Sequence, residues 1–374
     1  MPALNTPTDS DNSHNEILIE VNQLSRHFSN TNKNNAAIIA VDAISFNLHR
    51  GEVLGFLGPN GAGKSTTMQM LTGNLAPTHG QIKIAGMDLM DKPIEAKAKI
   101  GYLPDTPPLY KELSVDEYLK YCAQLNQVAK PQISAALAMA KERCGLTKHG
   151  QRVINNLSKG YQQRVGIAQA IIHSPDIVIL DEPTVGLDPI QMVEIRKLIK
   201  DLGKTHSVML SSHILPEIQA ICDHVQIINQ GKLVFNASIA QLNQHMQTQT
   251  LQMRCSNPVD IAKITALDSI IKVEQQGNIF TLDCAFPSST ETRAEISTES
   301  STENQNAIIH TSQQLVALAQ QEQWGLYELY PQKQTLEDIF MSLTGVDKSL
   351  QANNKSSQVP SSDISSDALS GAAP

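Results

Sequence analysis

Residues 58–66 read Gly-Pro-Asn-Gly-Ala-Gly-Lys-Ser-Thr and decide the fold of this 374-residue chain. They follow an apolar run, Val53–Leu57, that predicts a buried strand, and they lead into a helix-compatible segment that begins at Thr66. Glycine backbones can wrap closely around an anion because they have no Cβ and tolerate a positive φ. The N–H groups of such a turn, together with the start of the next helix, bind phosphate oxygens. The stretch therefore predicts a phosphate-binding loop between a strand and a helix.

The last residues of this loop indicate that the phosphate belongs to a nucleoside triphosphate. Lys64 can reach the β- and γ-phosphates, and the hydroxyl of Ser65 can bind Mg²⁺. A glycine-rich turn without a ligand is the alternative, but chance matches to the pattern are rare, on the order of 1 % in a chain of this length. The expected binding residues are Gly58, Pro59, Asn60, Gly61, Ala62, Gly63, Lys64, Ser65 and Thr66.

A second apolar run, Ile177–Leu180, ends in two acidic residues, Asp181 and Glu182. An acid at the carboxyl end of a buried strand beside a phosphate loop can hold Mg²⁺ directly or through water, and we assign this role to Asp181. Glu182 can then polarise an attacking water as a general base. The alternative is that one of the two acids only caps the following segment.

Strand-like and helix-like segments alternate between residues 16 and 245, which predicts an α/β layered domain. Ile44–Leu48 alternates between apolar and polar residues, as a half-buried strand does. Short apolar runs typical of buried parallel strands occur at Ile100–Leu103, Ile177–Leu180, Val208–Leu210 and Val225–Ile228. Helical periodicity occurs at Val115–Val128, Ile133–Cys144, Gln162–Ile172 and Ile190–Leu202.

A different pattern begins near residue 248 and predicts a small α+β domain that extends to residue 345. Its order, strand–helix–strand–strand–helix–strand, is that of ferredoxin-like domains. The segments are Leu251–Cys255, Pro258–Leu267, Ile271–Glu274, Ile279–Cys284, Ser312–Gln323 and Gly325–Tyr330, with one more helix expected at Leu336–Leu343. Residues 285–307, rich in Ser, Thr and Glu, predict a flexible insertion, and residues 1–15 and 347–374 are expected to be disordered.

Composition restricts the class of protein. The formal net charge is −8 and no long basic run offsets it, so we expect no nucleic-acid partner. The five cysteines are far apart and odd in number, which favours reduced, mostly buried thiols in a cytosolic protein. The first residues have neither a basic start nor an apolar core, and no stretch approaches the roughly 18 apolar residues of a membrane span. A function at a membrane would need a partner with the spans.

The stretch Leu157-Ser-Lys-Gly-Tyr-Gln-Gln-Arg164 adds a possible second anion site, because Ser158 and Gly160 at a helix start present a hydroxyl and free N–H groups. Alone, such a pattern is usually only a helix cap. The order GPNGAGKST, LSKGYQQR, IVILDEP, GLD and SSH, however, resembles the ATP-binding subunit of an ABC transporter, from about Ile17 to Phe235. This resemblance implies a P-loop ATPase fold with a helical subdomain at about residues 104–172 that docks on a permease.

The resemblance also implies a dimer in which each ATP is enclosed by two subunits. Ser158 and Gly160 would contact the γ-phosphate held by the Lys64 of the other subunit. Asp188 matches the loop that links the two sites, and His213 matches the switch histidine that contacts the γ-phosphate. Phe28 matches the aromatic residue that stacks on adenine, although it could simply belong to the core.

Two positions depart from the family pattern. Asp105 stands where the family usually has a Gln that binds Mg²⁺ and relays ATP binding to the membrane partner. An Asp keeps an oxygen ligand but is shorter and charged, so its contact could run through water. The signature segment reads LSKGY in place of LSGGQ, which adds the cation of Lys159 and replaces an amide by Tyr161. Ser158 and Gly160 remain, so catalysis is expected while its rate is open.

The stretches GYLPDTPPLYKELSVDEYL and QTLEDIF resemble bacterial exporters whose permease is a separate six-helix polypeptide, including relatives linked to gliding motility, copper-enzyme maturation and multidrug export. We therefore expect an ATP-hydrolysing homodimer on the inner face of the cell membrane that drives a separately encoded permease for export. A soluble ABC-type ATPase that acts on ribosomes or DNA is one alternative. A regulatory subunit that does not hydrolyse ATP is the other.

Overall fold

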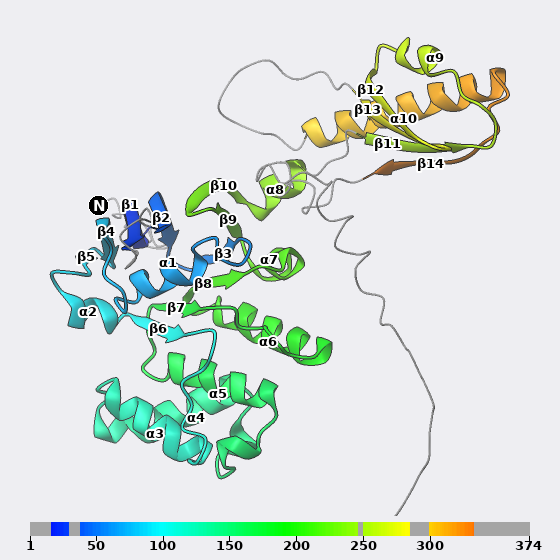
Figure 1. Cartoon of the computed structure of the whole chain (residues 1–374). Coiled ribbons are helices and arrows are strands. Elements are labelled where there is room, and N and C mark those ends of the chain that lie inside the picture. The colour runs from blue at the N-terminus through cyan, green and yellow to red at the C-terminus, as the bar shows by residue number, and fades with distance from the viewer. Residues whose placement is uncertain (1–15, 30–37, 246–249, 285–298, 333–374) are drawn as a thin grey trace, which may run out of the picture.

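The computed structural model describes residues 16–29, 38–245, 250–284 and 299–332 (Figure 1). Its strands form three sheets. The segments predicted to be disordered, 1–15 and 347–374, and the predicted helix Leu336–Leu343 lie outside the described residues. Within the described ranges, no helix is both long enough and apolar enough to cross a lipid bilayer.

The central sheet has the strand order β10-β9-β3-β8-β7-β6 and is parallel except for β10 at its edge. Its strands are β3 (Val53–Leu57), β6 (Ile100–Leu103), β7 (Ile177–Leu180), β8 (Ser207–Ser212), β9 (His224–Asn229) and β10 (Lys232–Ser238). Every residue of β3, β7 and β8 is buried. Both faces of the sheet are covered, and for this reason these strands read as continuous apolar runs in the sequence.

An antiparallel sheet of order β2-β1-β4-β5 packs beside the central one. It consists of β1 (Ile17–Phe28), β2 (Ile38–His49), β4 (His79–Ile84) and β5 (Met87–Asp88). Helix α1 (Lys64–Leu71) buries Met68 in a core shared with Leu18 of β1 and Phe56 of β3. The helix that follows the phosphate-binding loop is thus held between the two sheets.

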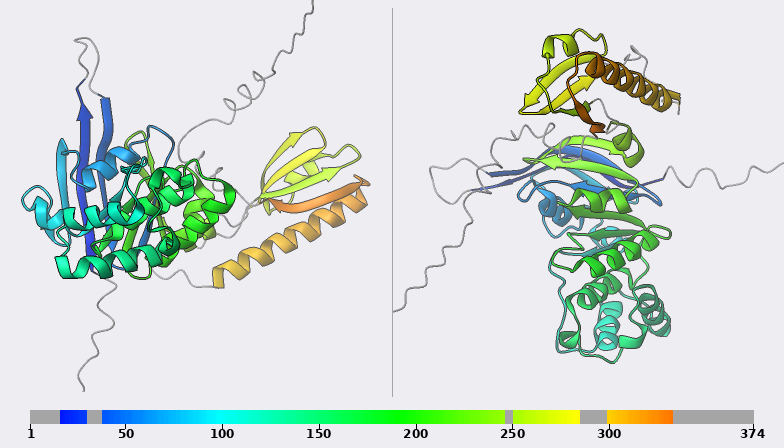
Figure 2. Two further views of the ribbon diagram at one scale, coloured as in Figure 1. Left: turned by 90° about the horizontal axis from the view of Figure 1, so that it is seen from below. Right: turned by 90° about the vertical axis from the view of Figure 1, so that its right-hand side faces the viewer.

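Helices cover the other face of the central sheet and extend beyond it (Figures 1 and 2). They are α3 (Val115–Leu125), α4 (Ile133–Arg143), α5 (Lys159–Ile171), α6 (Pro189–Leu202), α7 (Leu215–Ile221) and α8 (Ile239–His245). The short helix α2 (Pro93–Lys97) instead buries Ala96 in the core that contains Met68 of α1. Val115 and Leu119 of α3 share one apolar core with Val165 of α5 and Leu180 of β7. The helices predicted from periodicity are all present, with ends within three residues of the prediction.

The third sheet is antiparallel, with the order β12-β13-β11-β14. Its elements are β11 (Thr250–Cys255), α9 (Ile261–Thr265), β12 (Ile270–Gln276), β13 (Ile279–Cys284), α10 (Glu299–Gln321) and β14 (Leu326–Gln332). This order is compatible with the predicted ferredoxin-like arrangement. Leu282, Leu315 and Trp324 belong to its own core.

One segment of this region differs from the prediction. Helix α10 begins at Glu299, so the second part of the predicted flexible insertion, residues 299–307, is helical. The prediction of the start at Ser312 relied on apolar periodicity, which marks only the part of a helix that packs on the sheet. A polar segment can extend a helix beyond its packed turns, and it carries no apolar periodicity that would reveal it.

Candidate active site

The phosphate-binding loop runs from the end of β3 at Leu57 to the start of α1 at Lys64. Gly63 caps α1 with φ 109°, and a Cβ there would lie 2.5 Å from the carbonyl oxygen of Ala40. At Gly58 a Cβ would collide with the carbonyl oxygen of Ile228 on β9. Positive φ and close backbone approach explain why only glycine fits these two positions. The loop therefore exposes its N–H groups at the start of a helix.

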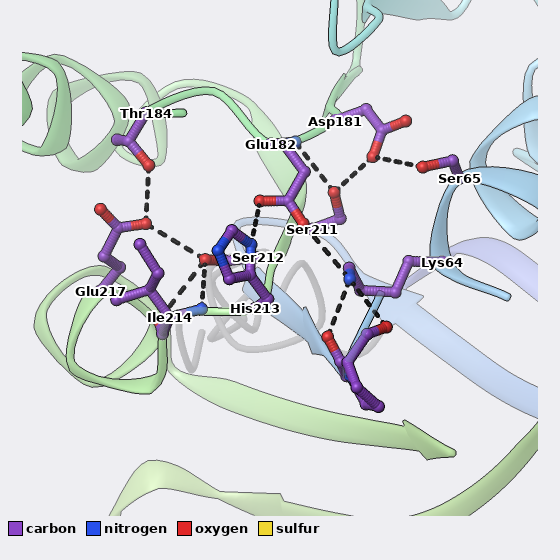
Figure 3. Close-up of polar contacts among 12 residues, drawn as sticks. Lys64, Ser65, Asp181, Glu182, Thr184, Ser211, Ser212, His213, Ile214 and Glu217 are labelled. Carbon is purple, nitrogen blue, oxygen red and sulfur yellow. Dashed lines mark hydrogen bonds and ion pairs between the residues drawn. The ribbon is translucent and has the colours of Figure 1, made fainter. Parts of the chain in front are cut away.

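Lys64 points back into this loop (Figure 3). Its Nζ donates to the carbonyl oxygens of Gly58 at 2.8 Å and Pro59 at 3.3 Å, and lies 3.2 Å from Oε1 of Glu182. The side chain is only 5 % exposed. One carboxylate and two carbonyl partners offset the desolvation cost of this buried ammonium. The ammonium occupies the mouth of the loop, where an anion would bind.

Asp181 lies at the carboxyl end of β7 beside Ser65 of α1. Its Oδ1 accepts hydrogen bonds from the Ser65 hydroxyl at 3.3 Å and from the Ser211 hydroxyl at 2.5 Å. Burial raises the pKa of Asp181 and the two hydroxyl donors oppose this effect, while the carboxylates of Glu182 and Asp105 raise the pKa further. Carboxylate and hydroxyl oxygens that crowd together in this way fit a hard divalent cation.

Glu182 is shared between two partners. Oε1 faces Lys64, and Oε2 lies 2.9 Å from Nδ1 of His213. The backbone at Glu182 has φ 48°, and its N–H donates to Oγ of Ser211 at 2.9 Å. A non-glycine residue with positive φ is strained, so the turn depends on contacts such as this one. The geometry leaves the carboxylate at the end of β7, between the cation of the loop and the imidazole after β8.

These groups border a cavity of about 340 Å³. Its lining includes the predicted residues Asn60, Gly61, Gly63, Lys64, Ser65, Thr66, Asp105, Glu182 and His213. Two further lining residues, Ala40 and Val185, were not predicted. Ser211 was also missed, although it stands in the SSH motif. Its role depends on the pairing of β7 with β8, which a single motif does not reveal.

Eight predicted residues do not line this cavity. Four of them, Gly58, Pro59, Ala62 and Asp181, belong to the loop and the strand end beside it, and the other four lie outside these segments. Phe28 ends β1, and the guanidinium of Arg26 lies 4.7 Å from the centre of its ring, so the predicted stacking on adenine stays a prediction. Ser158 caps α5 by accepting from the N–H of Tyr161 at 3.4 Å, and Asp188 caps α6 by accepting from the N–H of Gln191 at 2.9 Å. Gly160 is buried under the side chain of Gln191.

Comparison with known proteins places this site in a family. Residues 41–185 match the family model described as ABC transporter. The sequence is 34 % identical to the ABC transporter ATP-binding protein NatA of Bacillus subtilis, over 63 % of this chain and 95 % of that protein. This chain belongs to the ATP-binding proteins of ABC transporters. The family is one of ATPases, and the P-loop fold and ATP as the nucleotide follow from membership.

Other ABC ATP-binding proteins share shorter or weaker similarity. The linearmycin resistance protein LnrL of B. subtilis is 30 % identical over 82 % of this chain and 93 % of its own length. The bacitracin transport protein BcrA of Bacillus licheniformis is 41 % identical, over 52 % of this chain and 63 % of its own length. A solved ATP-binding subunit of an ABC transporter has 29 % identity and a TM-score of 0.53, over 61 % of this chain and 92 % of its own.

Proposed function

We propose that this ABC protein is the ATP-hydrolysing subunit that energises a separate membrane permease, an exporter, and that it acts as a head-to-tail homodimer. The observation that supports it most is the convergence of Lys64, Glu182 and His213 on one cavity at the phosphate-binding loop. ATP hydrolysis needs three kinds of group at this place. They are a cation that can bind phosphate, a carboxylate that can take a proton, and an imidazole that can contact a phosphate.

Each group has a role that follows from its position. Lys64 exchanges the carbonyls of Gly58 and Pro59 for the β- and γ-phosphates, because a phosphate carries more negative charge than a carbonyl. This exchange leaves Glu182 to accept a proton from the attacking water. His213 lies within hydrogen-bond distance of Glu182 and can contact the γ-phosphate.

Ser65, Asp181 and Asp105 are the residues that would hold Mg²⁺, which neutralises phosphate charge when bound. Ser65 and Asp181 already share a hydrogen bond, and Asp105 lines the same cavity. All three present oxygen atoms, as Mg²⁺ prefers. Asp105 keeps this donor type although it replaces the usual amide.

A dimer accounts for the residues that lie off the cavity. Ser158 is exposed at the start of α5, where a second subunit's nucleotide could reach it. Around Asp188 the side chains of Val185, Ile190 and Val193 are exposed, the last two by 75 % and 61 %. A cluster of exposed apolar side chains indicates a surface that another subunit covers.

The relatives support coupling to a permease and the export direction. BcrA is named for bacitracin transport and LnrL for linearmycin resistance. A structurally similar protein, CbiO1 of Clostridium perfringens, is described as part of an ABC transporter complex; it has 27 % identity and a TM-score of 0.55, over 61 % of this chain and 91 % of its own. The exposed aromatic side chains of Tyr110, which precedes α3, and Tyr121, which lies on α3, offer a docking surface for the permease at the inner face of the membrane.

Two substitutions test the proposal. Glu182→Gln should lower kcat for ATP by on the order of 10²-fold or more and retain ATP binding, because the amide keeps the shape of the side chain but cannot take the proton. Lys64→Ala should lose ATP affinity in calorimetry. Asp116→Asn, which alters an ion pair with Lys141 in the helical segment, is the matched control and should change neither property. Hydrolysis by Glu182→Gln at the wild-type rate would refute the assignment of the base.

A further inference from the structure

A buried carboxylate outside the cavity connects the two turns that carry the reacting groups. Glu217, on α7, is 1 % exposed. Its Oε2 accepts hydrogen bonds from the hydroxyls of Thr184 at 2.6 Å and Ser212 at 3.1 Å (Figure 3). Nη2 of Arg196 lies 3.4 Å from Oε1 of Glu217. Thr184 and Ser212 are also buried.

The two hydroxyl partners stand next to the site. Thr184 comes two residues after Glu182, and Ser212 comes directly before His213. Glu217 therefore joins the turn after β7 to the turn after β8, on the side away from the cavity. Ser211 joins the same two turns on the other side, through Asp181 and the N–H of Glu182. The contact of Glu182 with His213 lies between these two connections.

A carboxylate at this buried position costs more free energy than an apolar side chain would. A buried carboxylate is costly unless hydrogen bonds compensate its desolvation, and an apolar residue would fill the space at lower cost. Here each oxygen of Glu217 has a partner, so the group is compensated, and the bonds are directional. The strained backbone of Glu182, with φ 48°, is the kind of turn that needs support from outside itself.

We propose that Glu217 is a positioning residue for ATP hydrolysis, which sets the spacing between the Glu182 turn and the His213 turn without touching the nucleotide. The proposal rests on the proposed function, because it assumes that Glu182 and His213 act together. Displacement of a catalytic group by about 1 Å can lower a rate by on the order of 100-fold, so a loose connection would reduce turnover more than binding.

The test compares Glu217→Ala with Glu217→Gln in the full chain. Calorimetric titration with ATP gives the dissociation constant and the number of binding-competent chains, and steady-state assays with MgATP give kcat per competent chain. We expect Glu217→Ala to lower this kcat by on the order of 10-fold or more, with the dissociation constant changed by less than about 2-fold. Glu217→Gln keeps an acceptor for both hydroxyls and should stay within about 3-fold of wild type.

Thr184→Val and Asp116→Asn complete the experiment. Thr184→Val removes one arm of the connection at nearly constant volume and should lower kcat in the same direction as Glu217→Ala, by a smaller factor. The control Asp116→Asn should leave kcat per competent chain unchanged. The positioning role is contradicted if Glu217→Ala has wild-type kcat per competent chain, or if Glu217→Gln loses as much as the alanine variant. A wild-type chain that binds ATP but does not hydrolyse it would instead refute the proposed function.

Discussion

At the scale of single residues, two adjacent serines form hydrogen bonds on opposite sides of the turn that carries Glu182. Ser211 points toward Asp181 and the N–H of Glu182, while Ser212 points toward Glu217. Neighbouring residues of a strand face opposite sides, so one pair of hydroxyls can bind to both sides of the catalytic turn. The small polar residues before His213 are therefore part of the geometry that places Glu182.

Asp181 gives the protein a pH-dependent stability. Because its pKa is raised in the folded protein above the ordinary value of 3.8, the folded state binds more protons than the unfolded chain in the interval between the two values. The free energy of unfolding therefore falls as pH rises through this interval, and at neutral pH the buried charge is a cost.

We expect Asp181→Asn to be more stable than wild type at pH 7 without nucleotide or Mg²⁺. The neutral amide avoids the buried charge and still offers an oxygen to Ser211. A Tm about 2–4 °C higher by differential scanning calorimetry is the expected result, with the difference shrinking toward pH 4. A wild-type protein that is the more stable of the two at pH 7 would contradict this explanation.

The residues that bear the chemistry could be predicted because each belongs to a short motif beside a strand or helix end. Lys64 and Glu182 are of this kind. Thr184 and Glu217 could not be predicted to meet, since 33 residues separate them and only the packing of α7 against the turn brings them together. Sequence spacing says nothing about such contacts, whereas it fixes those within one loop.

At the scale of elements, two helices begin with a serine cap but differ in what the cap does. Ser114 of α3 forms a capping box with Glu117, in which each residue bonds the backbone of the other. Ser158 of α5 makes only the longer contact, 3.4 Å, to the N–H of Tyr161 and has no reciprocal bond of this kind. The first cap stabilises a helix, while the second leaves its hydroxyl available.

This contrast gives a paired prediction. Ser114→Ala should lower the free energy of unfolding by about 1 kcal/mol, measured by urea titration, and leave kcat per folded chain unchanged. Ser158→Ala should cost less stability but lower kcat by on the order of 10²-fold, if its hydroxyl contacts the partner subunit's nucleotide. Each variant is the control of the other. A wild-type kcat for Ser158→Ala would remove the main argument for a site that is shared between two subunits.

Elements whose apolar pattern is strong were predictable, and their ends were less so. The buried strands β6 and β7 coincide with the predicted runs because an apolar run cannot extend into solvent. The half-buried strand β13 also has the predicted bounds. Helix α10 was predicted to start thirteen residues too late, since its first turns carry no apolar stripe. Polar helical turns are indistinguishable from a polar loop by periodicity alone.

At the scale of the whole molecule, we propose that a second chain completes the site. Lys64, Glu182 and His213 border one cavity, whereas the exposed Ser158 and the buried Gly160 lie at the start of α5 and do not line it. In the proposed dimer one chain would hold the phosphate-binding loop and the base, and the second anion site would serve another copy. We therefore expect ATP binding to stabilise a dimer of two chains.

The most direct test of this claim is the mass of Glu182→Gln in sedimentation equilibrium, with and without saturating MgATP. Without hydrolysis the closed state should persist, so we expect a monomer in the absence of nucleotide and a dimer in its presence. Adding Ser158→Ala to this variant should weaken the dimer, while adding Ser114→Ala should not. A Glu182→Gln variant that binds ATP in calorimetry but remains monomeric at saturating MgATP would contradict the account.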